Sequence, residues 1–333
     1  MRSNLTIPPM ITHRRLGEML KIRTRTSAMT DEELCLDCAG LRWVDPAGLC
    51  LLRHLIQSLN ERNVIVHLRD LPLEMESYMR RMDLFADAPN LRFDDRTGSY
   101  ARNDLQGNLV ELHDVTRVDD SDATALRIAR TIVAQIPTIS TATDPDGMCP
   151  SDAEKADKSI AYVFSELLDN ALIHGRRRGY THAQATVAAQ YFPRRKRLQI
   201  AIVDDGCGLL QSLQSHPRLQ DGHSHEAAIR LALEPRVSCN RDLRYAHDSA
   251  NQGVGLTVST RLALASGGEF TIYSGDSAYN EDANGRAATW RTAGWDGTGV
   301  FIEFCSERLP TIDVSQVVAA LPGFRQVPGL HFQ

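Results

Sequence analysis

The chain has 333 residues, of which 42% are hydrophobic and 24% are charged, with a formal net charge of −5. This length allows two domains with separate cores, and the negative charge gives no indication of a nucleic-acid partner. No apolar run reaches the roughly 20 residues of a membrane helix, and the N-terminus lacks the apolar segment of a secretory signal. We therefore expect no membrane contact.

Seven cysteines are scattered along the chain. Cys35 and Cys38 form a CxxC pair, but no second pair completes a zinc site. We expect buried free thiols here, and hence a reduced, cytoplasmic protein.

The first part of the chain, over residues 31–87, alternates between strand and helix patterns. The expected elements, in order, are a strand over 33–45, a helix over 47–62, a strand over 63–70 and a helix over 73–85. This alternation predicts a small α/β domain, to which we assign residues 1–88. Residues 89–108 are polar and weakly patterned, and we expect a linker there.

A second domain is expected over residues 109–310, followed by a C-terminal tail at 311–333. It begins with a helix over residues 121–136, for which Ser121 or Asp122 would serve as the N-cap.

A helix around residues 160–174 carries polar residues beside its apolar stripe. The apolar stripe consists of Ile160, Val163, Phe164, Leu167, Ala171 and Leu172. Glu166, Asn170 and His174 are spaced four apart, so an α-helix places them in a row on one face. His174 fits a core histidine as well as a pocket residue.

The first glycine cluster follows a strand over residues 198–204, whose apolar side chains alternate with polar ones. Asp204 continues the apolar face, so its carboxylate is expected at the strand's end on the covered side. Gly206 and Gly208 then let the backbone turn sharply and approach a ligand closely.

The second glycine cluster opens a helix that ends at Gly267 or Gly268. It consists of Gly253, Val254, Gly255 and Leu256. Glycines at a helix start leave N–H groups exposed at its positive end, which suits a phosphate.

Taken together and in this order, the motifs resemble the GHKL ATPase family, which includes gyrase B, the heat-shock chaperone ATPase, histidine kinases and MutL. The resemblance covers roughly residues 109–310 and ends with the Gly-Thr-Gly at 297–299. It implies the Bergerat ATP-binding fold, an α+β two-layer sandwich with a mixed sheet and helices on one face. ATP would lie between the layers.

The resemblance also implies roles for individual residues. Asn170 would hold Mg²⁺ against the phosphates, and Asp204 would accept a hydrogen bond from the adenine amino group. Thr298 would support Asp204 through water. Glu166 would orient or deprotonate an attacking water. The two glycine clusters and His174 complete the expected nucleotide site.

Residues 209–250 correspond to the family's ATP lid. A helix capped by Ser224 is expected within it. The lid arginines are Arg218, Arg230, Arg236, Arg241 and Arg244. Any of them could reach a terminal phosphate, although a solvated surface explains each one more simply.

Residues 37–72 resemble a STAS domain, the fold of anti-anti-sigma factors, and imply an α/β N-terminal domain. In that family a phosphate-accepting hydroxyl follows the strand, but here Asp45 is followed by Pro46 and Ala47. We therefore expect a docking element that is not phosphorylated, with the loop near Asp45 free for contacts.

These features predict an Mg²⁺-ATP-binding regulatory protein of bacterial partner switching, closest to the anti-sigma serine/threonine kinases. Its partner would be a STAS-type or other regulatory protein, or a second copy of the chain. Two alternatives stay open: a dimerising ATPase of the gyrase B or MutL kind, and a non-catalytic ATP-gated module. No lysine follows Lys196, which counts against the gyrase architecture.

Overall fold

The computed structural model describes residues 2–96, 109–143, 146, 149–176, 183–219, 223–237 and 253–322, without the side chain of His174. The strands are β1 (Arg2–Thr6), β2 (Met10–Ile11), β3 (Glu33–Asp37), β4 (Trp43–Val44), β5 (Ile65–Arg69), β6 (Leu91–Phe93), β7 (Leu109–Val115), β8 (Ala185–Phe192), β9 (Arg197–Asp204), β10 (Glu269–Asp282) and β11 (Ala287–Cys305). The α-helices are α1 (Gly17–Ser27), α2 (Pro46–Glu61), α3 (Leu73–Arg81), α4 (Ser121–Val133), α5 (Asp152–Asp169), α6 (Gly208–Leu213), α7 (His225–Ala232), α8 (Gly255–Ala265) and α9 (Val314–Ala319).

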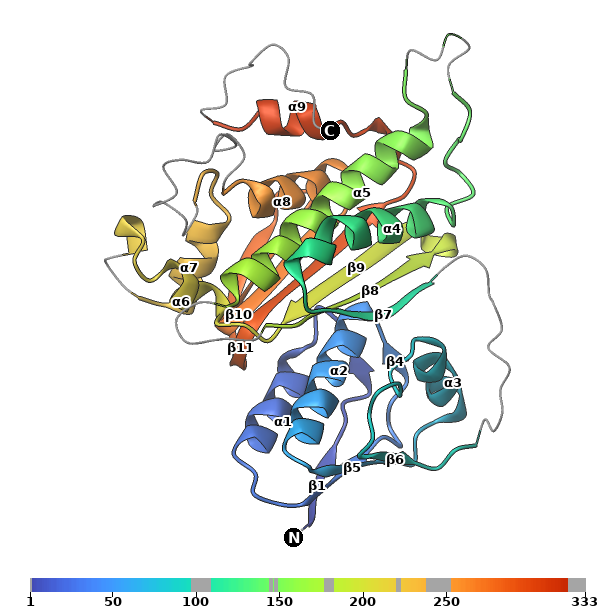
Figure 1. Cartoon of the computed structure of the whole chain (residues 1–333), viewed down its shortest axis with the longest axis vertical. Helices are drawn as coiled ribbons and strands as arrows, with labels where there is room; N and C mark the ends of the chain where they lie inside the picture. Colours follow the sequence, from blue (N-terminus) through green and yellow to red (C-terminus); the bar gives the residue numbers. More distant parts are fainter. Residues whose placement is uncertain are drawn as a thin grey trace.

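The N-terminal part is an α/β unit built on a parallel sheet in the order β1-β3-β5-β6 (Figure 1). The expected alternation of strand and helix is confirmed, but the single strand expected over 33–45 is wrong: β3 ends at Asp37, and β4 pairs with β2 in a separate two-stranded sheet. Cys35 and Cys38 are buried free thiols, as expected.

Two predictions about the ends of this unit are corrected. No element was expected before residue 31, but β1 and α1 are present, and α1 buries Met19 and Leu20. The expected linker over 89–108 contains β6, which extends the sheet beside β5. The residues of that segment from 97 onward lie outside the described part. Short strands such as β6 carry too few side chains to produce a recognisable period.

The second sheet has the order β10-β11-β9-β8-β7, and every pairing in the described part is antiparallel. The expected mixed sheet is therefore wrong. Tight connections explain the difference: β8 reaches β9 through the turn Pro193–Arg195, and β10 reaches β11 across residues 283–286. Strands joined by such short turns run antiparallel.

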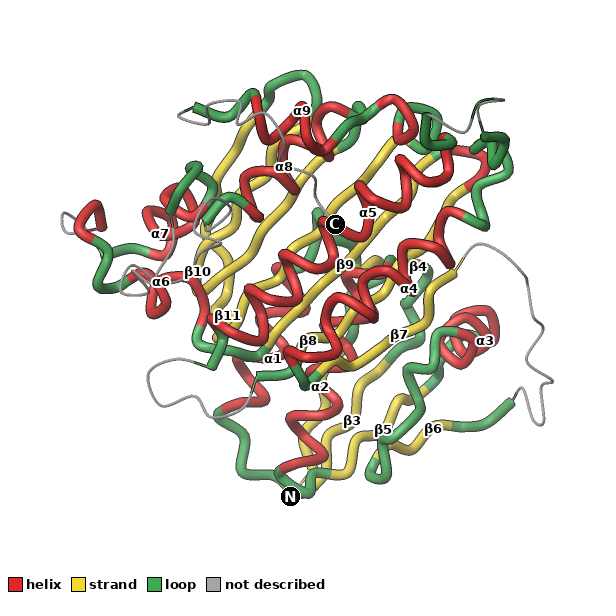
Figure 2. Tube along the Cα trace, turned by 45° about the horizontal axis from the view of Figure 1, so that its top comes forward, coloured by secondary structure: helices red, strands yellow, loops and turns green. Residues whose placement is uncertain are grey.

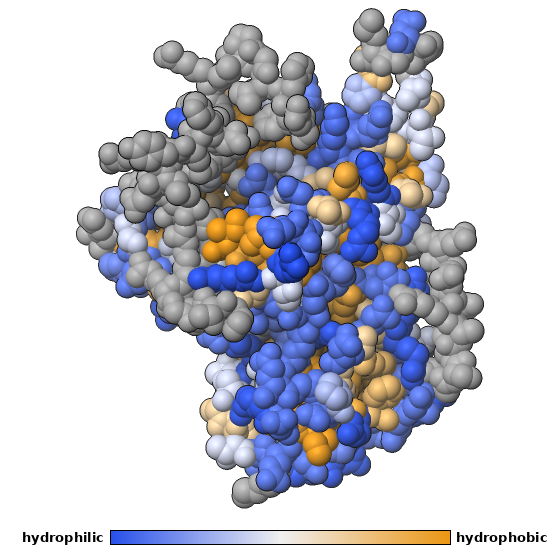
Figure 3. Space-filling model, viewed as in Figure 1, coloured by the Kyte–Doolittle hydropathy of each residue, from blue (hydrophilic) through white to orange (hydrophobic). Residues whose placement is uncertain are grey.

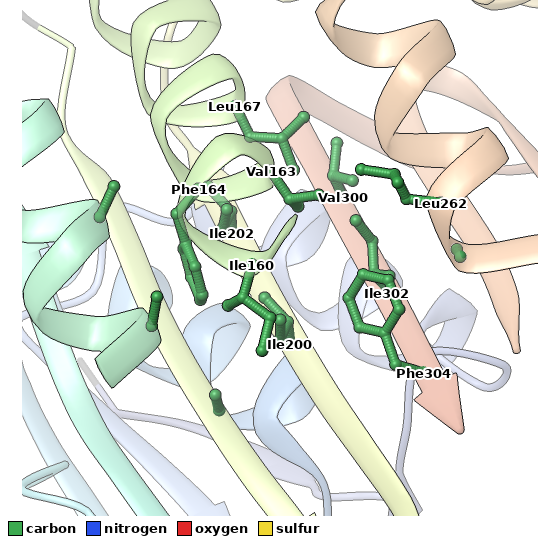
Figure 4. Close-up of a cluster of buried hydrophobic side chains, with 14 of the residues drawn as sticks. Ile160, Val163, Phe164, Leu167, Ile200, Ile202, Leu262, Val300, Ile302 and Phe304 are labelled. Carbon is green, nitrogen blue, oxygen red and sulfur yellow. The ribbon is translucent and has the colours of Figure 1, made fainter. Parts of the chain in front are cut away.

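Helices α4, α5 and α8 cover one face of this second sheet (Figures 1 and 2). Figure 4 shows the core that they form, with Ile160 and Phe164 of α5 above Ile200 and Ile202 of β9. The alternation along β9 is confirmed, because Leu198, Ile200 and Ile202 all face this core. Asp204 continues the same side and is buried.

The other face of the sheet is covered by α1 and α2 of the N-terminal unit. Trp295 and Phe301 of β11 belong to the same apolar cluster as Leu20 of α1 and Leu51 of α2. The described helices of residues 109–310 lie on one face, as expected, but the cover of the other face by the N-terminal unit was not expected. The second face of a sheet that is apolar on both sides needs its own cover, and the N-terminal unit provides it.

This packing overturns the prediction that the loop near Asp45 is free for contacts. Asp45 is 2% exposed, and Pro46 and Ala47 are also buried. Asp45 Oδ1 accepts a hydrogen bond from the Gly48 N–H at the start of α2, while Oδ2 lies 2.9 Å from His13 Nδ1. Residues 45–47, which correspond to the phosphoacceptor segment of the STAS family, therefore face the second sheet of the same chain.

Two smaller predictions are also corrected. The predicted N-caps of α4 make no capping bond: the N-cap is Asp120, and the Ser121 hydroxyl donates to Asp169 instead. The expected tail at 311–333 contains α9, and Leu321 joins the core.

The described surface is largely hydrophilic over the N-terminal unit (Figure 3), since α1 and α2 turn their apolar sides toward the two sheets. Among the described residues, no helix is long and apolar enough to cross a membrane.

Candidate nucleotide site

Asp204 occupies the last position of β9, where the strand meets the first glycine cluster. Its carboxylate is buried, and Oδ1 accepts hydrogen bonds from the N–H groups of Gly206 at 2.9 Å and Thr298 at 3.2 Å. None of the described residues donates to Oδ2, which is left for a ligand. Burial raises the pKa of Asp204 to about 7, although the two amide hydrogen bonds oppose this shift.

Gly206 and Gly297 allow other backbone segments to approach Asp204. A Cβ on Gly206 would lie 2.4 Å from the Cα of Gly175, and a Cβ on Gly297 would lie 1.9 Å from the carbonyl oxygen of Asp204. The Cys207 N–H donates to the Gly175 carbonyl at 3.0 Å. The first glycine cluster therefore lies against both the end of the Glu166 helix and the Gly-Thr-Gly segment.

Gly208 begins α6 with a φ of +70°, a conformation that favours glycine. A Cβ there would lie 2.8 Å from the Asp296 carbonyl oxygen. Ser274 Oγ fixes the same turn, since it accepts from the Leu209 N–H at 2.9 Å and donates to the Gly297 carbonyl at 3.1 Å.

Glu166 lies on α5 directly beside the start of α8. A Cβ on Gly255 would lie 2.0 Å from Glu166 Oε2, so only glycine lets the two helices approach this closely. Burial raises the pKa of Glu166 to about 7, with a smaller contribution in the same direction from Asp169 and Asp122. A carboxylate with this pKa can accept a proton near neutral pH.

The second glycine cluster contributes the start of α8. Gly253 has a φ of +80°, and Val254 is buried at the N-cap. Gly255 is buried, and Leu256 packs at the edge of the core. The positive end of α8 thus points to the side of the site that holds Glu166.

Asn170 follows α5 at the first position of a π-helix over Asn170–His174. The expected α-helical row of three residues is therefore corrected, because the wider π turn changes the stacking after Asn170. The Asn170 side chain is half-buried one turn beyond Glu166. The placement predicted for the His174 side chain lies outside the description. π turns inside helices occur frequently at functional sites.

The lid helix is confirmed as α7, and Ser224 caps it by accepting from the Ala227 N–H. Arg218 pairs with Glu234, and Arg230 pairs with Glu226. Arg236 lies just before the end of the described part of the lid at residue 237, and Arg241 and Arg244 lie outside the described residues, as does Asn251.

The structure thus brings four of the predicted segments together: Glu166 to Asn170, Asp204 to Gly208, Gly253 to Leu256, and Thr298. Sequence reasoning missed Ser274, which fixes the turn at Gly208, and Trp295, whose indole N–H donates to the Asp204 carbonyl at 2.9 Å. The Trp-Asp-Gly-Thr-Gly sequence at 295–299 contains the only available signal, a large aromatic residue directly before the glycines.

The fold and this constellation are compatible with a nucleotide-binding domain of the GHKL ATPase class. Residues 156–300 match the family of histidine kinase-, DNA gyrase B-, and HSP90-like ATPases. The matched segment contains every predicted site residue from Glu166 to Thr298. No curated protein matches the chain.

The residues fit ATP in three respects. Asp204 has one carboxylate oxygen, Oδ2, to which no described residue donates, as an adenine amino group requires. Gly206 and Gly208 keep the backbone beside it free of side chains. The start of α8 offers helix N–H groups for phosphate. Asn170 adds one amide oxygen, the type of ligand that Mg²⁺ accepts alongside phosphate oxygens and water.

Proposed function

We propose that the chain is an Mg²⁺-ATP-binding regulatory protein. The observation that carries this proposal is the arrangement around Asp204, where a buried carboxylate receives the Gly206 and Thr298 N–H groups on one oxygen. The same carboxylate lies at the meeting point of both glycine segments and the Glu166 helix.

In the bound state Asp204 would accept from the adenine amino group, and Asn170 would hold Mg²⁺, which neutralises phosphate charge. Glu166 would accept the proton of the attacking hydroxyl or water, and its raised pKa supports this role. The N–H groups at the start of α8 would bind phosphate oxygens.

We further propose that this domain serves bacterial partner switching as a serine/threonine kinase, with the N-terminal unit of STAS type. The α/β architecture and the parallel sheet of residues 2–93 support a STAS-like unit. The partner would be a separate STAS-type or regulatory protein, or a second copy of the chain. The buried free thiols support a cytoplasmic protein.

A competing proposal is an ATPase without a protein acceptor, and a further one is an ATP-gated module without turnover. Glu166 argues against the last of these, because a half-buried carboxylate of raised pKa is costly to keep without a function. Incubation with γ-labelled ATP, alone and with STAS domains, separates the other two. Free phosphate indicates an ATPase, and labelled STAS protein indicates a kinase.

Calorimetry with Mg²⁺-ATP tests the binding site. Asp204→Ala should weaken binding about tenfold or more, because one buried acceptor is lost. Asn170→Ala should weaken binding only when Mg²⁺ is present. Asp205→Ala is the matched control, since its neighbouring carboxylate is exposed and accepts from the Gln184 N–H. Unchanged affinity in both Asp204→Ala and Asn170→Ala would overturn the site.

A further inference from the structure

The N-terminal unit packs on the face of the second sheet opposite the ATPase helices, next to Asp204, the residue expected to bind adenine. His54 of α2 is buried and donates from Nε2 to the carbonyl oxygen of Val203 at 3.0 Å. The next carbonyl, of Asp204, accepts from Trp295 Nε1 at 2.9 Å. The last two backbone carbonyls of β9 are therefore both held by side chains on the face opposite the ATPase helices.

The two donor side chains also contact one another. The rings of His54 and Trp295 meet edge to face with their centroids 5.5 Å apart. This geometry is a favourable one for aromatic pairs. Burial lowers the pKa of His54, so its neutral form donates one hydrogen bond and adds no charge behind the site.

Arg23 of α1 contacts Trp295 as well. Its guanidinium lies 4.4 Å from the centroid of the Trp295 ring and 3.1 Å from Asp296 Oδ2. The Arg23 side chain is 18% exposed, so the solvent screens this contact only in part. Asp296 precedes Gly297 and Thr298, and the Thr298 N–H is one of the two donors to Asp204.

We propose that Arg23 and His54, acting through Trp295, are positioning residues that orient Asp204 for adenine recognition. The N-terminal unit is then part of the nucleotide site's support. A change in how α1 and α2 pack on the sheet alters the carboxylate that reads the base. This inference rests on the proposed ATP site.

The geometry explains why such support matters. Asp204 is a buried carboxylate held on one oxygen by two backbone N–H groups, that of Gly206 in the loop after β9 and that of Thr298 in β11. Fixing its own carbonyl and the Trp295–Thr298 segment restricts how the carboxylate can rotate. Recognition that depends on a hydrogen bond discriminates strongly only when the group is held in place.

Two variants test the proposal. Trp295→Phe removes the indole N–H and keeps an aromatic ring. Arg23→Met removes the guanidinium at a partly exposed position and keeps the apolar stem. Each should weaken Mg²⁺-ATP binding about fivefold, the loss of one ordinary hydrogen bond, while Mg²⁺-GTP binding stays the same. The preference for ATP over GTP therefore falls.

Two matched controls remove hydrogen bonds across the same interface that involve neither Trp295 nor Asp204. Tyr273→Phe removes a hydroxyl that donates to the His13 carbonyl at 2.8 Å. Arg14→Met removes an ion pair with Glu269, the first residue of β10, which lies five residues before Ser274, the partner of Thr298. Both controls loosen the contact between the two units but should leave the ATP preference at the parent value.

Amide hydrogen exchange supplies a readout that does not depend on nucleotide. Exchange at Thr298 should become faster in Trp295→Phe and Arg23→Met, and not in the controls. A parental ATP preference in both test variants, or an equal loss in all four variants, overturns the inference. Asp204→Ala is measured alongside: if that variant binds ATP as the parent does, the nucleotide site itself is wrong, and the inference falls with it.

Discussion

Gly255 and Glu166 touch across the junction of α8 and α5: a Cβ at position 255 would lie 2.0 Å from Glu166 Oε2 and 2.8 Å from its Cβ. The glycine therefore serves two purposes. It leaves the N–H groups at the start of α8 accessible, and it lets the carboxylate lie beside them.

Gly255→Ala should lower both the stability of the fold and the affinity for Mg²⁺-ATP. The added methyl group has no space, so α8 or the Glu166 side chain must move, at a cost of about 1–3 kcal/mol in the free energy of unfolding. Thermal unfolding and Mg²⁺-ATP calorimetry measure the two effects. Gly294→Ala is the control, since a Cβ there meets nothing within 4 Å. If both variants lost the same stability and the same Mg²⁺-ATP affinity, the close contact between Gly255 and Glu166 would be contradicted.

Turnover should rise with pH through about 7, whichever acceptor the enzyme uses. Glu166 acts as a base only when ionised, and burial raises its pKa to about 7. Phosphate release or transfer is measured between about pH 6 and 8, with Mg²⁺-ATP saturating at each pH. Glu166→Gln should bind ATP and show little turnover at any pH. A parental rate in this variant would show that Glu166 is not the base.

The ATPase elements could be predicted because their signals are local and strong. The alternation that ends in Asp204 and the glycines that open α8 each reflect one element's own geometry. The same holds for the Ser224 cap of α7, which needs only three residues. These predictions depend on chain periodicity and backbone freedom, and both are encoded within a few positions.

The contacts between the two units could not be predicted in this way. Trp295 and His54 are 241 positions apart in the chain, and neither residue type indicates a partner. The burial of Asp45 depends on the sheet that packs over it, so its sequence context suggested a free loop. The π-helix at Asn170 also escaped, since an apolar period cannot separate an α turn from a π turn.

Asp204→Asn should stabilise the protein at neutral and alkaline pH. Burial raises the pKa of Asp204 from 3.8 to about 7, so the folded state disfavours the ionised form. Stability therefore falls as pH rises from about 4 to 7, and an amide avoids this loss while still accepting from the two N–H groups. The melting temperature of the variant should exceed that of the parent at about pH 8 and converge with it near pH 5.

The affinity of Asp204→Asn for Mg²⁺-ATP should be lower than that of the parent, because stability and function conflict at a buried carboxylate. A melting difference that does not depend on pH would show that ionisation of Asp204 is not its cause.

His13 should tie the two units together most strongly below about pH 7. Its Nδ1 lies 2.9 Å from Asp45 Oδ2 and its Nε2 lies 2.6 Å from Glu269 Oε1. These carboxylates raise the pKa of His13 to about 9 against the opposing effect of burial. Because the folded pKa is the higher one, the stabilisation is complete below 6.5 and disappears as pH rises through about 9.

The free energy of unfolding should therefore drop by about 3 kcal/mol across this window, as urea titrations at several pH values would record. His13→Gln should be less stable at pH 6.5 and should lack the drop, since Asp45 and Glu269 then share no cation. His223→Gln, at an exposed position, is the control. A parental pH dependence in His13→Gln would remove His13 from this role.

The N-terminal unit should carry no stoichiometric phosphate after long incubation of the chain with Mg²⁺-ATP. The phosphoacceptor positions of the STAS pattern hold Pro46 and Ala47, which lack a nucleophilic atom, and both are buried against the second sheet. Ser58 and Ser77 are half-buried on α2 and α3, and none of the described residues makes a hydrogen bond that would activate either hydroxyl. Mass spectrometry of residues 31–90 measures the outcome, with Asn170→Ala as the control for ATP dependence. Full phosphorylation of Ser58 or Ser77 that Asn170→Ala abolishes would make the chain a substrate of its own ATPase domain, and the N-terminal unit a switch.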